Sequence, residues 1–332
     1  MSREEVFLAA WQQAIRFLPG ELRQLFERLP VKLQVQVVEV RLRIKQPLAI
    51  NLGETDQFIT PEGRLTTVIE QGLLITPDLI LKTINACTSG SFYALEEEFS
   101  KGYLTLPGGH RLGFTGRVLL SEGKIRLIRD LSSLNLRIAK AVIGAADFVL
   151  PYLCEQGRFL KTIIIAPPGA GKTTLLREIV RMVSTGIAEL NLPGLKVGVV
   201  DERSEIAGCF QGIPQLEIGS RTDVLDACPK REGVYLLLRA MNPDLIVTDE
   251  IGREDDPVLL QDIINAGVSF LTTAHAYNFE EALRRPILQA IFKNQAIERV
   301  IVLSNRLGMG TIEEILAISD GQVLWARRRG NG

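Results

Sequence analysis

The sequence is poor in the residues that build several common kinds of site. Its 332 residues include only two histidines, two tryptophans and four cysteines. The cysteines have neither the close spacing of a zinc site nor the density of a disulfide framework. We therefore expect free thiols in a reducing compartment. The four positions are Cys87, Cys154, Cys209 and Cys228.

The sequence also lacks an excess of charge and a long apolar run. Lys and Arg number 38 against 39 Asp and Glu, so the formal net charge is −1 and nothing global attracts a polyanion. No uninterrupted apolar run approaches the ~18 residues that span a bilayer. The first residues carry acids in an amphipathic pattern rather than a secretion signal. We predict a cytoplasmic protein without a direct membrane span, in which nucleic-acid binding is unlikely and could only be local.

The chain length and the apolar patterns predict two α/β domains. At roughly 150 residues per domain, the chain has room for about two. Residues 1–145 predict a smaller α+β N-terminal domain with two amphipathic helices within 4–29, alternating strand patterns that include 63–69, a helix at 77–89 and then an antiparallel sheet. Residues 146–332 predict a RecA-like P-loop domain with a mainly parallel sheet, the boundary falling between 142 and 158. Its strands are expected at 161–167, 196–202, 244–250, 268–275 and 299–304, followed by a hairpin of 310–319 and 321–328.

A phosphate-binding turn follows the first buried strand of the second domain. The segment reads A-P-P-G-A-G-K-T-T and opens an amphipathic helix. Such a turn aims backbone N–H groups and the positive end of a helix at phosphates. Lys172 supplies positive charge, and the Thr173 hydroxyl is a ligand for Mg²⁺. Alanine stands where the motif usually begins with glycine. The predicted nucleotide-binding residues are Ala166, Pro167, Pro168, Gly169, Ala170, Gly171, Lys172, Thr173 and Thr174.

Acidic and polar residues lie at the carboxyl ends of three other predicted strands. Asp249 and Glu250 end the strand at 244–250, where α/β sheets place ligands. We expect Asp249 to hold Mg²⁺ and Glu250 to accept a proton from the attacking water. His275, with Thr273, is expected at the same edge, sensing the γ-phosphate or polarising water, and Glu202 is a candidate for orienting water or the metal ion.

These motifs resemble P-loop ATPases of the secretion-ATPase branch, within the RecA-like class that places a glutamate after the Walker B aspartate. The segments that match its Walker A, Walker B and histidine boxes are APPGAGKTT, DLIVTDEIG and TTAHA. More specifically, the chain resembles the stage III sporulation protein AA family. That resemblance extends from about residue 95 to residue 316 and rests on GYLTLPGGHRLGFTGRV, SSLNLRIAK, APPGAGKTTLLREIVR, VVDERSEIAG and VLDACPKREG.

The resemblance implies a mother-cell ATPase of endospore-forming bacteria that uses ATP and Mg²⁺. It also implies a homo-oligomer, a hexameric ring with nucleotide held between subunits, working with the membrane proteins of a channel to the forespore. In related secretion ATPases, N-terminal arginines reach the phosphates, and the positions here that fit are Arg111 and Arg137. A guanidinium neutralises the charge that phosphoryl transfer spreads over oxygen atoms. Further candidates for this contact are Arg117, Arg221 and Arg239.

Two other functions remain open from the sequence. A RecA-like nucleic-acid-dependent ATPase would need a basic strip bearing aromatic residues. Only the short segment Trp325–Arg329 offers one, and such tails are usually solvated ends. The other is a scaffold that assembles on binding ATP and hydrolyses it slowly. The hydrolytic residues are visible in the sequence, but their rate is not.

Overall fold

The computed structural model describes residues 2–53, 55–88, 102–121, 123–293, 297–319 and 321–327. The chain forms two compact units, Met1–Ala141 and Val142–Gly332. Among the described residues, no helix combines the length and the apolar character that crossing a bilayer requires. The predictions for Ser89, for Arg328 and Arg329, and for the segment around residue 95 where the resemblance begins lie outside the described residues.

The first unit packs helices on an antiparallel sheet. The sheet has the order β4-β3-β2-β1-β7-β6-β5. Its strands are β1 (Glu39–Arg43), β2 (Ala49–Asn51), β3 (Asp56–Ile59), β4 (Leu65–Thr66), β5 (Tyr103–Leu106), β6 (His110–Ser121) and β7 (Lys124–Arg137). The helices are α1 (Arg3–Ile15), α2 (Gly20–Glu27), α3 (Val31–Gln34) and α4 (Pro77–Thr88), with a 3-10 turn η1 (Ile69–Gln71).

The core of the first unit forms where the helices bury their apolar stripes on the sheet. Trp11 of α1 and Phe26 of α2 are fully buried and meet edge to face with 5.4 Å between ring centroids. They lie in one cluster with alternate residues of β1, such as Val40 and Leu42. The period-two and helical patterns of this half predicted most of its elements. They missed α3 and β3, and 63–69 forms only the short β4 and η1 instead of a longer strand.

The second unit contains a mainly parallel sheet. Its order is β12-β11-β13-β14-β10-β15-β16-β17, with the last two strands antiparallel. These strands are β10 (Thr162–Ala166), β11 (Val197–Asp201), β12 (Thr222–Asp226), β13 (Leu245–Thr248), β14 (Ser269–His275), β15 (Arg299–Ser304), β16 (Thr311–Ala317) and β17 (Gln322–Ala326). A small separate hairpin pairs β8 (Cys154–Glu155) with β9 (Arg158–Phe159).

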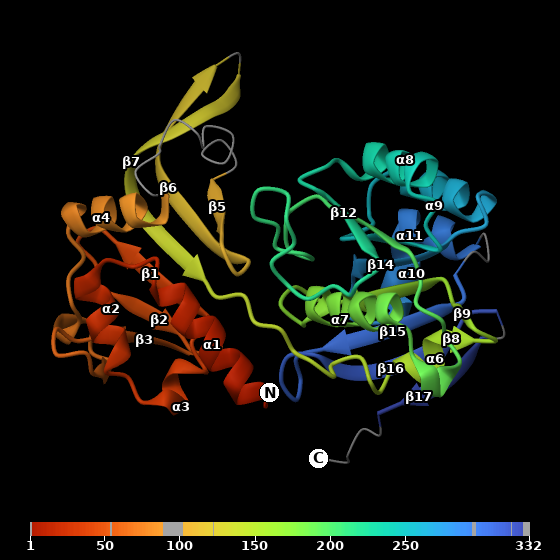
Figure 1. The fold of residues 1–332 in the computed structure, drawn as a ribbon, viewed down its shortest axis with the longest axis horizontal. Helices are drawn as coiled ribbons and strands as arrows, with labels where there is room; N and C mark the ends of the chain where they lie inside the picture. Colours follow the sequence, from red (N-terminus) through yellow and green to blue (C-terminus); the bar gives the residue numbers. More distant parts are fainter. Residues whose placement is uncertain are drawn as a thin grey trace. The chain divides into compact units, whose positions relative to one another are not determined.

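Helices cover both faces of the parallel sheet (Figure 1). The helices are α6 (Leu150–Leu153), α7 (Lys172–Thr185), α8 (Lys230–Ala240), α9 (Asp256–Asn265), α10 (Phe279–Arg284) and α11 (Pro286–Lys293), with a 3-10 turn η3 (Ala188–Leu190). Ile164 of β10 belongs to the cluster under α6 and α7, whereas its neighbours Ile163 and Ile165 belong to the cluster under α8 to α11. Both faces are thus apolar, as expected for a parallel sheet. The predicted α/β fold class, with an α+β half before a parallel half, is confirmed.

The strand order brings the predicted site residues to one edge. β10 lies between β14 and β15, and Ala166 is the register partner of His275. β13 is the other parallel neighbour of β14. The carboxyl ends of β10, β13 and β14 therefore lie side by side, which is where open α/β sheets bind ligands.

Candidate nucleotide-binding and catalytic site

The phosphate-binding turn connects β10 directly to α7. Gly169 and Gly171 have φ angles of 74° and 87°, in the left-handed region that favours glycine. Gly171 is the N-cap of α7, and Lys172 is the first residue of the helix. Ala166 is fully buried as the last residue of β10, so the alanine in place of the usual glycine fits an extended strand. Thr173 and Thr174 lie half-buried in the first turn of α7.

The Lys172 ammonium is held by its own turn and by a histidine. Its nitrogen donates to the carbonyl oxygens of Ala166 and Pro167 at 3.0 and 3.2 Å, and it lies 2.8 Å from Nδ1 of His275. Burial lowers the pKa of Lys172, and the carboxylates of Glu250 and Asp249 oppose that shift. The amine is therefore positioned at the turn.

Glu250 is linked to the same histidine. Its Oε2 lies 3.3 Å from Nε2 of His275, and both side chains are about one-third exposed, at 34% each. A connected row of side chains thus runs from Lys172 through His275 to Glu250. Thr273, two residues before His275, donates from its hydroxyl to the Asp249 carbonyl at 2.7 Å. The structure places these residues together, while their catalytic roles stay predictions.

Asp249 lies among other carboxylates. Burial is the main cause that raises its pKa to about 7, and the carboxylates of Glu205 and Asp201 add to it, while Arg203 opposes it. Such a concentration of negative charge favours a proton or a cation. This environment therefore fits a divalent ion next to Asp249. The half-buried Thr173 is the other predicted ligand.

Glu202 makes its contacts away from this row. Its Oε1 accepts a hydrogen bond from the Lys230 backbone N–H at 3.1 Å and lies 3.3 Å from Nη1 of Arg253. The adjacent Asp201 is fully buried and accepts the backbone N–H groups of residues 205, 206 and 207. Glu202 therefore has an ion-pair and capping role in this structure, and its role in orienting water stays a prediction.

Two of the candidate arginines lie opposite each other on neighbouring strands. Arg111 and Arg137 are register partners on β6 and β7 in the first unit. The Arg111 guanidinium lies 3.5 Å from the centroid of the Tyr103 ring, and Arg137 lies 3.4 Å from Glu39.

The other candidates differ in their surroundings. Arg117 is an exposed residue farther along β6, opposite Arg129. Arg221 donates to the backbone carbonyls of Ser184 and Thr185 at the end of α7. This contact stabilises the carbonyl end of the helix, so it gives Arg221 a structural role. Arg239 donates to the carbonyl of Tyr235 one turn earlier in α8.

Sequence reasoning missed two features of the site. Lys230 and Asp256 form a buried ion pair beside Glu250. In addition, the loop before β16 packs on the phosphate-binding turn, since the Gly310 N–H donates to the Ala170 carbonyl at 3.1 Å. Lys230 does begin a helix in the motif CPKREG, but nothing in a linear pattern shows that its amine is buried.

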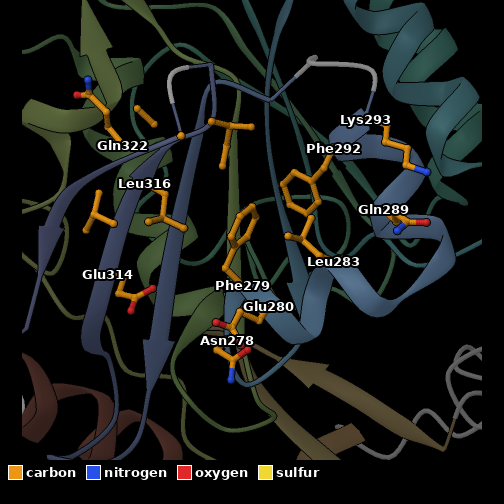
Figure 2. Close-up of a pocket in the computed structure, with 14 residues that line it drawn as sticks. Asn278, Phe279, Glu280, Leu283, Gln289, Phe292, Lys293, Glu314, Leu316 and Gln322 are labelled. Atoms are coloured by element: carbon orange, nitrogen blue, oxygen red, sulfur yellow. The ribbon is translucent and has the colours of Figure 1, made fainter.

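A separate hollow lies on the face of the sheet that α10 and α11 cover. Its volume is about 800 Å³, and Phe279, Leu283 and Phe292 face Leu316 of β16 across it (Figure 2). Polar side chains, including Lys293 and Glu314, stand at its margin. It shares no residue with the phosphate-binding turn.

Sequence comparisons match this chain along most of its length. A family model described as "Sporulation stage III, protein AA" matches residues 9–323. The chain is 40% identical over 307 residues to the stage III sporulation protein AA of Bacillus subtilis strain 168, covering 92% of this chain and 95% of that protein.

Solved structures share the fold at low identity. The ATPase DotB of Legionella pneumophila is similar with a TM-score of 0.56 at 17% identity, over 86% of this chain and 76% of that one. The pilus retraction motor PilT with bound ADP gives a TM-score of 0.51 at 14% identity, over 82% of this chain and 75% of that one. The fold is therefore that of P-loop secretion ATPases.

Proposed function

Because the chain belongs to the stage III sporulation protein AA family, we propose that it binds and hydrolyses ATP as a secretion-type ATPase during endospore formation. In this proposal, the hydrolysis energises or assembles a membrane channel complex between mother cell and forespore. The observation that carries the proposal is the connected row of Lys172, His275 and Glu250 at the carboxyl edge of a parallel sheet.

The residues present fit a triphosphate. Gly169 is exposed and no atom lies within 4 Å of a Cβ built on it, so the turn leaves room for a ligand there. In the described part of the chain, no side chain caps the start of α7, a helix of 14 residues whose N-terminus attracts anions. Within the described residues, the Lys172 amine makes its hydrogen bonds to two carbonyl oxygens and an imidazole, and it can exchange these neutral partners for phosphate oxygens.

The surroundings of Asp249 fit a magnesium ion. We assign Thr173 and Asp249 as its protein ligands, because hydroxyl and carboxylate oxygens suit Mg²⁺ and the carboxylates of Glu205 and Asp201 add negative charge at Asp249. When bound, Mg²⁺ neutralises charge that develops on the phosphates.

The side chains then divide the chemistry. Lys172 binds and orients the outer phosphates, and Glu250 accepts a proton from the water that attacks the γ-phosphate. His275 orients the Glu250 carboxylate through its Nε2–H. Arg111 and Arg137 are the candidates for a contact from a neighbouring subunit, with Glu202 as a secondary candidate for orienting water.

The proposal extends to assembly and location. We propose a homo-oligomeric ring, a hexamer, in which a second copy completes each nucleotide site. Its partners are the membrane proteins of the same sporulation channel complex, contacted from the cytoplasmic, mother-cell side.

Two variants test the proposed activity. Lys172→Ala is expected to lose binding of labelled ATP in millimolar Mg²⁺, because the phosphates lose their contact with the lysine. Glu250→Gln is expected to retain ATP binding and to hydrolyse ATP at least about 10²-fold more slowly than wild type. Lys161→Ala, at the opposite end of β10, is the matched control and should behave as wild type. Absence of ATP uptake by the folded wild-type protein would reject the proposal.

The same assays separate the alternatives. A nucleic-acid-dependent ATPase would be stimulated by single-stranded DNA or RNA, and that stimulation would disappear at high salt. A slow scaffold would form a larger assembly on binding ATP. In single-turnover measurements, it would hydrolyse its bound ATP more slowly than the assembly forms and dissociates.

A further inference from the structure

The turn that carries Glu250 is fixed at nearly every peptide group. The Asp249 carbonyl accepts the Thr273 hydroxyl at 2.7 Å, and the Ile251 N–H donates to the Thr273 carbonyl at 2.8 Å. These two bonds attach one side of the turn to β14. The other side, from the Glu250 carbonyl to the N–H of Arg253, is held by two charged side chains that no sequence motif assigned.

Lys230 holds the carbonyl end of that side. It begins α8, its side chain is only 4% exposed, and its nitrogen donates to the Glu250 carbonyl at 2.7 Å. Its own backbone N–H donates to the side chain of Glu202, the residue that follows β11. Lys230 therefore connects the start of α8 to the main chain of Glu250, the proposed base.

Asp256 holds the amide end. It is the first residue of α9 and its side chain is 1% exposed. One carboxylate oxygen accepts the N–H groups of Gly252 and Arg253 at 2.6 and 2.8 Å, and the other oxygen pairs with the Lys230 ammonium. The pair thus binds the turn at both ends with complementary charges.

A buried ion pair is weak evidence for stability, because burying both charges costs nearly as much as their attraction returns. Here the charges are directed at main-chain groups of a single turn. In a buried site of low polarity, such charge-assisted hydrogen bonds are strong and restrict movement. The arrangement therefore suits a task of positioning.

We propose that Lys230 and Asp256 are positioning residues that fix residues 250–253 and thereby aim the Glu250 carboxylate. This inference rests on the proposed function, since it needs Glu250 to act as the base. Neither residue touches the reacting atoms; each acts through the main chain next to Glu250.

The test is a double variant, Lys230→Met with Asp256→Asn. Changing one partner alone would leave the other charge buried and could unfold the protein. The double variant removes both charges at nearly constant shape. The neutral asparagine oxygen accepts the Gly252 and Arg253 N–H groups more weakly than the carboxylate does. The double variant therefore loses the bond from Lys230 to the Glu250 carbonyl and weakens the bonds to both of these amides.

The matched control is Lys161→Met with Glu298→Gln. This pair is 3.2 Å apart and lies at the opposite edge of the sheet, just before β10 and β15. In this control, the glutamine oxygen can still accept the Lys161 backbone N–H, which now donates to Glu298.

Three measurements are needed on folded protein: kcat and KM for ATP, and hydrogen exchange of the peptide covering residues 249–256. We expect kcat to fall about 10- to 100-fold, as for other misplacements of a reacting group near 1 Å. KM should change less than about twofold, because Lys172 and the phosphate-binding turn are untouched. Exchange at residues 251–253 should become faster, and the control should match wild type in all three.

Each contrary result has a distinct meaning. Unchanged kcat in the double variant overturns the inference, as does an equal fall in kcat in the control. If wild-type protein binds ATP without hydrolysing it, the proposed function fails, and exchange alone decides whether the pair fixes the turn. Unchanged exchange at residues 251–253 then overturns that part as well.

Discussion

Nδ1 of His275 lies 2.8 Å from the Lys172 ammonium, and its Nε2 lies 3.3 Å from the Glu250 carboxylate. An ammonium can only donate, so Nδ1 is the acceptor and Nε2 carries the proton that is directed at Glu250. A single neutral imidazole thus connects the phosphate-binding lysine with the proposed base.

The first prediction concerns this imidazole. In His275→Asn, the amide oxygen can replace Nδ1 as an acceptor for Lys172, but the donor to Glu250 is lost. A hydrogen bond to a charged group contributes about 1.5–3 kcal/mol, so kcat should fall roughly 10- to 100-fold. ATP affinity should change little. Steady-state kinetics with an equilibrium ATP-binding assay checks this, and an unchanged kcat would contradict it.

The second prediction compares two glycines of the phosphate-binding turn. Both have positive φ angles, but a Cβ on Gly171 would lie 3.2 Å from the Gly310 nitrogen and from Cγ of Met309, whereas a Cβ on Gly169 has no atom within 4 Å. Gly169→Ala should cost only backbone strain of about 1–2 kcal/mol. Gly171→Ala should cost more and should also displace the loop before β16.

Urea unfolding of the two variants checks the comparison of these glycines. The excess destabilisation of Gly171→Ala over Gly169→Ala measures the crowding against Met309 and Gly310. Equal unfolding midpoints would show that the loop gives way without cost.

The third prediction concerns the register partners Arg111 and Arg137. If an arginine acts on the nucleotide of a neighbouring subunit, Arg111→Ala or Arg137→Ala should lower kcat by about 10³-fold. Mixing the inactive arginine variant with Glu250→Gln should then restore part of the activity, because some sites receive an intact arginine and an intact glutamate.

The mixing experiment also assigns the arginine. Restoration with only one of the two variants identifies that residue as the one acting between subunits. An activity loss that mixing never restores would show that the arginine acts within its own subunit or only supports the fold.

The fourth prediction is a pH dependence of the first unit. Burial lowers the pKa of His110 to about 4, and its Nδ1 accepts the Ala139 N–H at 3.2 Å. An unfolded histidine has a pKa near 6.5, so between about pH 6.5 and 4 the unfolded chain binds more protons than the folded one. Stability is therefore lost as the pH falls through this window, by about 2 kcal/mol between pH 7.5 and 5.

His110→Asn isolates this contribution. Asparagine keeps an acceptor near the position of Nδ1 but does not titrate, so the variant should lose less stability on acidification than wild type. Urea unfolding followed at pH 7.5 and pH 5 checks this. The same pH dependence in both proteins would assign the acid sensitivity to other groups.

Local chemistry made most elements predictable, and the exceptions have physical reasons. The buried strands β10, β13 and β14 read as short apolar runs, since both faces of a parallel sheet are covered. β12 was not predicted, because it has the sequence TDVLD without a buried residue and, among the described strands, lies at the edge of the sheet beside β11. At residues 63–69, alternation predicted a strand, but only Leu65 and Thr66 pair with β3.

The candidate site also has features that local sequence predicts and features that only the folded chain sets. The sequence by itself determined the strand, the glycine turn and the helix that carry Lys172, and also the acids that end β13, because each depends on neighbours within a few residues. Only the tertiary structure decided that Lys172 meets His275, 103 positions along the chain, and that Lys230 and Asp256 are buried behind Glu250. Such contacts depend on the order of the strands in the sheet and on which charged side chains become buried when the chain folds. Neither can be read from a short stretch of sequence.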